Sequence, residues 1–90
     1  MNKEKQREAI AEICGYERNY PECLNAMHEA EQILWRMDWS HRYAFNDHLA
    51  NTIRGRTVNR NEWNAETLLD ATAAQRAEAF LRTVNKWEEL

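Results

Sequence analysis

The sequence predicts a mainly α protein, a compact bundle of four helices in a single domain that covers residues 1–90. Three observations predict this fold class. Apolar residues recur at spacings of three and four along most of the chain, which is the period of one helix face. The chain has only one proline and two glycines, too few for a series of tight hairpins. No stretch alternates apolar and polar residues for long enough to indicate a sheet.

The first two helices are expected at about residues 2–14 and 20–37. Gly15 follows the first helix and supplies the left-handed residue that ends it. Asn19 is expected to cap the second helix, with Pro21 in the first turn, where its missing N–H costs nothing. The longest helical pattern of the chain then forms the apolar face of this helix: Cys23, Ala26, Met27, Ala30, Ile33, Leu34 and Met37.

A third helix is expected at about residues 39–54. Asp38 or Ser40 is suited to cap its start, because both residue types accept hydrogen bonds from the first free N–H groups. Trp39 and Tyr43 lie to one side of the apolar line of this helix. That line is formed by Phe45, Leu49 and Ile53.

Residues 56–70 carry no clear period and are expected to be irregular, with a short strand or a turn both open. The fourth helix, at about 72–84, has the clearest pattern. Thr72 and Gln75 have the spacing of a reciprocal capping box, and Asn85 follows where a left-handed residue would end the helix. One apolar face is expected from Ala73, Ala77, Phe80, Leu81 and Val84. Three charged residues are expected to point away from that face: Arg76, Glu78 and Arg82.

Composition narrows the classes of function. The net charge of −3 argues against a general duplex-DNA binder, which needs a broad positive surface. No apolar run approaches the ~20 residues that span a bilayer, so we expect no membrane insertion and a cytosolic protein. Because no signal peptide precedes them, Cys14 and Cys23 are expected to be free, buried thiols.

Three stretches resemble a group of small phage-encoded proteins called ABA sandwich. They are AIAEICGY at 9–16, LNAMHEAE at 24–31, and residues 71–89, which end in TVNKWEE. The resemblance implies a phage or prophage gene product of undetermined biochemical role, and it brings no catalytic residues. The family usually has a longer, strand-forming segment after its first helix. Only residues 17–20 occupy that place here, which favours a mainly helical version.

The residues that usually carry catalysis or bind metals form no recognisable motif. His41 and His48 are seven residues apart, about 10.5 Å along a helix axis, which is too far for both to bind one metal. Neither Cys14 nor Cys23 lies in a motif that would activate a thiol, and glycine is too scarce for a phosphate-binding loop. We therefore expect no enzyme, no cofactor and no metal site.

A basic run that includes Arg54, Arg56 and Arg60 is the most prominent polar feature. Cations at a helix C-terminus complement the macrodipole, which is a sufficient structural explanation. The alternative is an anion site in which guanidinium groups hold phosphates or carboxylates, with Trp63 or Trp39 as a stacking platform. The same arginines could instead contact an acidic partner protein.

Aromatic residues exceed what the core of so short a chain needs to bury: Tyr16, Tyr20, Trp35, Trp39, Tyr43 and Trp63. Exposed Trp, Tyr and Arg residues anchor protein interfaces. The alternative is that these aromatic residues simply complete the core of a small domain. The candidate binding residues are accordingly Arg54, Arg56, Arg60, Trp39, Tyr43 and Trp63.

The function expected from these features is a small non-enzymatic binding protein of a phage. It would act in the cytoplasm of an infected bacterial host and inhibit a host defence complex by covering a macromolecular surface, as an anti-CRISPR protein does. One alternative is a sponge that sequesters a small nucleotide signal, and such a protein would be a homo-oligomer with sites between subunits. Another is a structural or regulatory phage protein without a host target.

Overall fold

The computed structural model describes residues 2–54 and 71–88, and these residues form four helices and no strand. The helices are α1 (Lys3–Cys14), α2 (Leu24–Met37), α3 (Ser40–Arg54) and α5 (Ala73–Thr83). The structure thus confirms the mainly α bundle. The segment 56–70 that was expected to be irregular lies outside the described residues. No helix in the described part of the chain is long and apolar enough to cross a bilayer.

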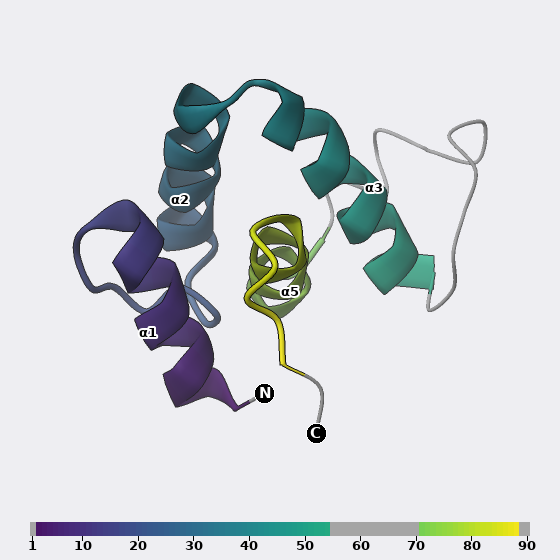
Figure 1. Ribbon diagram of the computed structural model, residues 1–90. Helices are drawn as coiled ribbons and strands as arrows, with labels where there is room; N and C mark the ends of the chain where they lie inside the picture. The colour runs from purple at the N-terminus through teal and green to yellow at the C-terminus, as the bar shows by residue number, and fades with distance from the viewer. Residues whose placement is uncertain (1, 55–70, 89–90) are drawn as a thin grey trace.

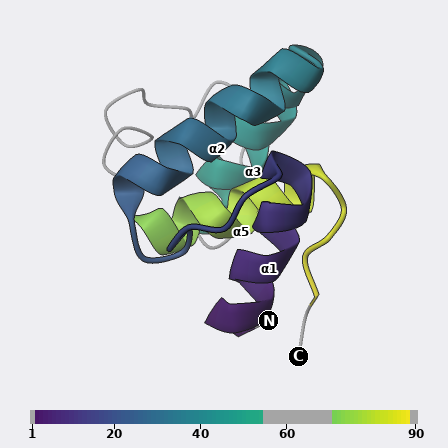
Figure 2. The same ribbon diagram turned by 90° about the vertical axis from the view of Figure 1, so that its left-hand side faces the viewer.

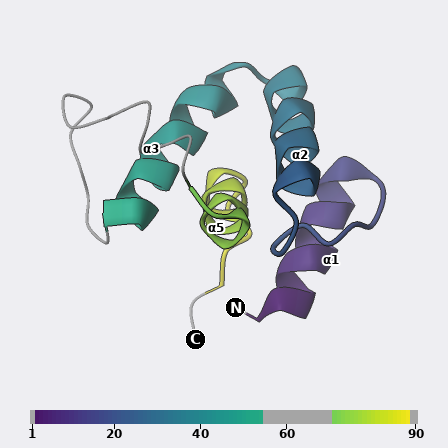
Figure 3. The ribbon, with the colours of Figure 1, turned by 180° about the vertical axis from the view of Figure 1, so that it is seen from behind.

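Helix α5 is the centre of the fold. It packs against α1, α2 and α3, most extensively against α3, and Figure 1 shows it almost end-on with α1 and α2 on one side and α3 on the other. Figure 2 shows α5 lengthwise, crossing α1 rather than running alongside it. Figure 3, seen from behind, again shows α5 with α3 on one side and α1 and α2 on the other. The largest fully buried side chains are Tyr20, Phe45, Phe80, Ile10, Met27, Leu34, Leu49 and Leu81.

Helix α2 begins at Leu24, four residues later than the pattern predicts. The preceding residues form a turn instead, in which the N–H groups of Glu22 and Cys23 both donate to the carbonyl of Asn19. This turn places Tyr20 in the core, completely buried, with its hydroxyl donating to the carbonyl oxygen of Tyr16 over 2.6 Å. The free energy gained by burying the Tyr20 ring therefore outweighs the local preference of Asn19 for capping a helix, and α2 begins later.

Caps at the other helix ends agree with the sequence. Gly15 ends α1 in the left-handed region with a φ of 85°. Thr72 and Gln75 form both bonds of the predicted capping box at the start of α5. At its end Asn85 has a φ of 60°, and the Lys86 N–H reaches back to the carbonyl of Leu81, as in a Schellman motif.

One prediction about α5 is wrong. Arg76 does not point into solvent but is buried, and its Nη1 donates over 2.7 Å to Oε1 of Glu31, which is buried on α2. The apolar pattern of α5 extends instead over Ala77, Ala79, Phe80 and Leu81, all of which are buried. Because α5 lies between the other helices, most of its circumference is covered and a polar residue can fall inside it.

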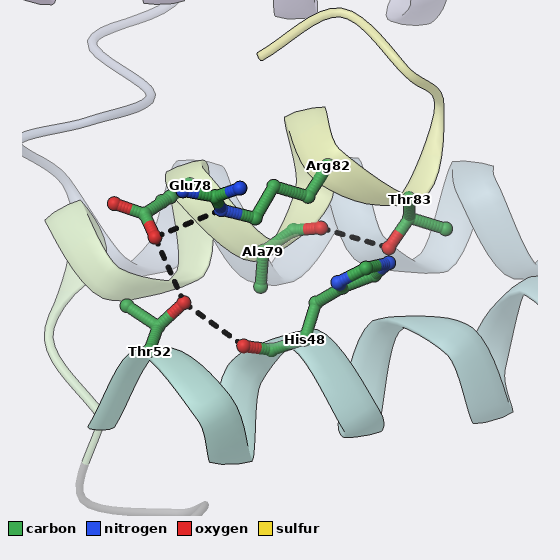
Figure 4. A network of polar contacts seen from close by, with 6 residues as sticks. All are labelled: His48, Thr52, Glu78, Ala79, Arg82 and Thr83. Carbon is green, nitrogen blue, oxygen red and sulfur yellow. Dashed lines mark hydrogen bonds and ion pairs between the residues drawn. The ribbon is translucent and has the colours of Figure 1, made fainter. Parts of the chain in front are cut away.

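A polar tie also joins α3 to α5, and Figure 4 shows it. The hydroxyl of Thr52 on α3 lies 3.0 Å from Oε2 of Glu78 on α5 and 2.9 Å from the carbonyl oxygen of His48. The same Glu78 oxygen accepts a 3.0 Å bond from Nε of Arg82. Glu78 and Arg82 therefore form the predicted i,i+4 ion pair, and that pair is half-buried against α3.

Candidate functional site

Exposed apolar side chains gather where α2 ends and α3 begins. Trp39 is 68% exposed, Met37 56% and Tyr43 46%. We call this region the aromatic corner and define it as Trp35, Met37, Trp39, Arg42 and Tyr43. Large apolar side chains exposed together on a small domain are uncommon without a binding role.

The break between the two helices positions the corner. Asp38 has extended backbone angles, φ −161° and ψ 116°, so α2 ends there and the chain turns. The Asp38 carboxylate accepts a 3.0 Å hydrogen bond from the backbone N–H of Ser40, and this bond lowers the pKa of Asp38. The cap therefore starts α3 at Ser40 and leaves Trp39 between the helices, where its side chain is exposed.

Ring contacts join the residues of the corner. Trp39 and Tyr43 are four residues apart and pack edge to face, with centroids 5.4 Å apart. The guanidinium of Arg42 lies 5.3 Å from the Trp35 ring centroid. Trp35 in turn packs edge to face on the buried ring of Phe45, which connects the corner to the core. Such aromatic and cation–π pairs add about 0.5–1.5 kcal/mol each beyond simple area burial.

A hollow of about 460 Å³ lies within the corner. Its lining is formed by Trp35, Trp39, Arg42, Tyr43 and Asn46. The indole Nε1 of Trp35 is buried and has no hydrogen-bond acceptor in the part of the chain that the structure describes. The hollow thus combines aromatic walls with the guanidinium of Arg42 and the amide of Asn46, both of which carry N–H donors.

The structure separates the residues that were predicted to form one site. Trp39 and Tyr43 lie near the start of α3, whereas Arg54 is its last residue and is exposed. About 20 Å of helix axis lies between the two ends. Trp39 is therefore too far from Arg54 to serve as its stacking platform, because the whole of α3 intervenes.

The remaining members of the basic run, Arg56 and Arg60, lie outside the described residues, as does Trp63. The anion site and the nucleotide sponge built on these residues stay predictions. Arg54 itself stands in the last turn of α3. A cation in that place complements the helix macrodipole.

Sequence reasoning missed two members of the hollow, Arg42 and Asn46. The signal was present, since Arg42 and Asn46 follow Trp39 at three and seven residues, the spacing of one helix face. Trp35 was recognised only as one aromatic residue among several. Of the other aromatics, Tyr16 is exposed, while Tyr20 is fully buried and belongs to the core.

The metal-ligating side chains and the thiols of residues 2–54 and 71–88 do not line the hollow. No three His, Cys, Asp or Glu residues within these ranges are grouped to hold a metal ion. Cys14 and Cys23 are free thiols, half-buried rather than fully buried. Burial raises the pKa of the Cys14 thiol, which keeps it protonated and a poor nucleophile. Burial also lowers the pKa of His48, and the nearby charge of Arg82 lowers it further.

Comparison with known proteins finds no matching family model, no matching curated protein and no matching solved structure. The aromatic corner is the feature of the described residues with the clearest binding chemistry.

Proposed function

We propose that this chain is a small binding protein that works by covering a surface of another protein, with the aromatic corner as its contact surface. The observation that carries the proposal is the exposure of Trp39, 68%, beside Met37 and Tyr43 on a fixed helix junction. Exposing these side chains forgoes the free energy of burial, about 25 cal/mol for each Å². A partner that covers them recovers that energy.

The corner has the composition of an interface hot spot. Trp, Tyr and Arg are the residue types that most often dominate binding energy, and they work best when grouped and shielded from water. The edge-to-face contact between Trp39 and Tyr43 restricts both rings before any partner arrives. A pre-organised surface loses less side-chain entropy on binding, so more of its contact energy appears as affinity.

The biological setting we propose is infection of a bacterium by a phage. Its support is the resemblance of residues 9–16, 24–31 and 71–89 to phage ABA sandwich proteins. In that setting the partner is a host defence complex in the cytoplasm, and the chain acts as an anti-CRISPR-like inhibitor by blocking a working surface. The mechanism is steric and needs neither catalysis nor a cofactor.

A capture experiment tests the proposal with a matched control. Tagged wild-type protein, Trp39→Ser and Leu24→Ser are incubated with bacterial lysate, and retained proteins are quantified by mass spectrometry. Leu24 is also exposed, 42%, but lies at the opposite end of α2. We expect the wild type and Leu24→Ser to retain one protein in a fixed ratio. Trp39→Ser should bind it about 30-fold more weakly, the loss typical of a hot spot of ~2 kcal/mol.

Circular dichroism should show the same helix content in all three proteins, because both substituted side chains are exposed. Equal retention by Trp39→Ser and wild type would contradict the proposal for the corner. A second assay measures interference by a CRISPR system against a target plasmid. Loss of inhibition in Trp39→Ser but not in Leu24→Ser would connect the corner to anti-defence activity.

A further inference from the structure

We infer that the aromatic corner recognises a carboxylate on an apolar segment of its protein partner, a Glu or Asp side chain flanked by large apolar residues. This inference rests on the proposed function and specifies the chemistry of the partner. It is carried by three features of the corner: a cation, Arg42, without an anionic partner among the described residues; aromatic walls around a hollow; and the N–H donors of Arg42 and Asn46 at its lining.

The cation is Arg42. Its guanidinium is stacked near the Trp35 ring, 5.3 Å from the centroid. No described residue forms an ion pair or a hydrogen bond with this guanidinium. Stacking on an aromatic face leaves the N–H groups at the edge of a guanidinium available, and their planar fork fits the two oxygens of a carboxylate. Arg42 is thus available for an anion that the described residues do not supply.

The local charge favours an anionic group. Among the residues that line the hollow, Arg42 is a cation and none is an acid, although the whole chain has a net charge of −3. The Asp38 carboxylate is already engaged by the Ser40 N–H. The hollow therefore carries one positive charge within an acidic protein, which attracts an acidic residue and disfavours a basic one.

The apolar walls of the hollow determine which residues of the partner can flank the carboxylate. Trp39 and Tyr43 provide apolar faces, and the hollow of about 460 Å³ between them and Trp35 has room for a side chain or two. Asn46 adds an amide, with its own N–H donors, at the lining. An acceptor group with apolar neighbours satisfies both the donors and the walls.

A nucleic acid fits these observations less well. Binding of a phosphate backbone relies on several cations that together release counterions. The hollow is lined by one arginine, and the only other cation of residues 35–46 is Arg36. One carboxylate beside apolar side chains, as on a protein surface, matches this charge better than a chain of phosphates.

The test uses short peptides as probes and the indole N–H signals of the protein in nuclear magnetic resonance. The probes are acetyl-Leu-Glu-Phe-amide and its isosteric control acetyl-Leu-Gln-Phe-amide, titrated to millimolar concentration. The Trp35 and Trp39 signals are assigned with Trp35→Phe and Trp39→Phe variants. We expect the Glu peptide to move both signals and to bind about tenfold more tightly than the Gln peptide, as expected for a charge-assisted hydrogen bond.

Arg42→Gln provides the matched variant, because Arg42 is exposed and has no ion-pair partner among the described residues. In this variant the preference for the Glu peptide should disappear, and it should also shrink in wild type as salt is raised. Equal binding of the two peptides, a preference that survives Arg42→Gln, or no movement with either peptide would each overturn the inference. So would stronger movement of the corner signals with an oligothymidine, which would indicate a nucleic-acid site.

The partner identified by capture separates the two proposals. If Trp39→Ser abolishes capture while Arg42→Gln leaves it unchanged, the corner is a protein-binding surface but carboxylate recognition is wrong. If both variants bind the partner at least about tenfold more weakly, the corner binds as inferred. If Trp39→Ser has no effect on capture, the proposed function fails at the corner, whatever the peptides show.

Discussion

Arg76 on α5 and Glu31 on α2 form an ion pair in which both side chains are almost completely buried. Nη1 of Arg76 donates to Oε1 of Glu31 over 2.7 Å, and the side chains are 7% and 3% exposed. No described residue donates to the second carboxylate oxygen, Oε2. Removing two charges from water is costly, so such a pair fixes the relative position of two helices more reliably than it stabilises the fold.

Removing one partner of this pair should lower the free energy of unfolding by an amount that depends on which charge remains. Glu31→Leu leaves a guanidinium that cannot lose its proton, so the free energy of unfolding should fall by about 3–5 kcal/mol. Arg76→Met should cost less, because the remaining carboxyl can take up a proton. The double variant should be close to wild type, since apolar residues often replace a buried pair without loss. Urea unfolding of the four proteins measures these differences, and additive losses in the double variant would contradict a coupled pair.

Stability should depend on pH through Glu31. Burial raises the pKa of Glu31 from 4.5 to about 7, although the charge of Arg76 and its hydrogen bond lower it. The folded state therefore binds more protons than the unfolded state between these values. The free energy of unfolding should fall as pH rises through this window, by on the order of 2 kcal/mol from about pH 5 to about pH 8.

Glu31→Gln is the control for this dependence, because its amide oxygen still accepts from Arg76 but does not titrate in this range. His48 contributes with the opposite sign. Its pKa is lowered by burial, so its contribution is present above the ordinary value of 6.5 and is lost as pH falls. The difference between wild type and Glu31→Gln isolates the carboxyl. A pH profile that is the same in both proteins would show that Glu31 keeps an ordinary pKa.

Thr52 and Thr83 allow a matched test of the hydrogen bond between α3 and α5. The Thr52 hydroxyl reaches Glu78 on the other helix, whereas the Thr83 hydroxyl donates only within α5, to the Ala79 carbonyl over 2.7 Å. Valine keeps the shape of threonine and removes the hydroxyl. We expect Thr52→Val to lower the free energy of unfolding by about 1 kcal/mol, the net worth of one hydrogen bond. Thr83→Val should cost less, and an equal or greater loss there would show that the interhelix bond is unimportant.

Helix ends could be predicted because their signals are local. The capping box of Thr72 and Gln75, the glycine at position 15 and Asn85 each depend on backbone geometry within one turn. The burial of Glu31 and Arg76 could not be predicted in the same way. Their pairing joins residues 45 apart, and a helical pattern shows only that each residue is polar, not that the other will meet it inside the core.

The start of α2 and the composition of the corner depend on long-range packing as well. Asn19 and Pro21 favour a helix start locally, but Tyr20 gains more from burial, so the turn prevails. Trp39 and Tyr43 were predicted as binding residues from their type. That Arg42 stacks on Trp35 from the preceding helix depends on the angle of the chain at Asp38, which no residue type specifies.

Phe80 provides the strongest test of α5 as the centre of the fold, since it is completely buried on the helix that contacts the other three. Phe80→Ala should cost about 3–5 kcal/mol, the transfer energy of the ring plus the cavity it leaves. For a domain of this size, ~1 kcal/mol corresponds to about 4–8 °C, so thermal unfolding should shift down by at least about 12 °C, or the domain should fail to fold. Phe80→Leu keeps an apolar side chain at this position and should lower the free energy of unfolding much less. The comparison separates the effect of reduced side-chain volume from the effect of lost apolar burial. A Phe80→Ala protein that unfolds cooperatively within a few degrees of wild type would show that α5 does not occupy the core.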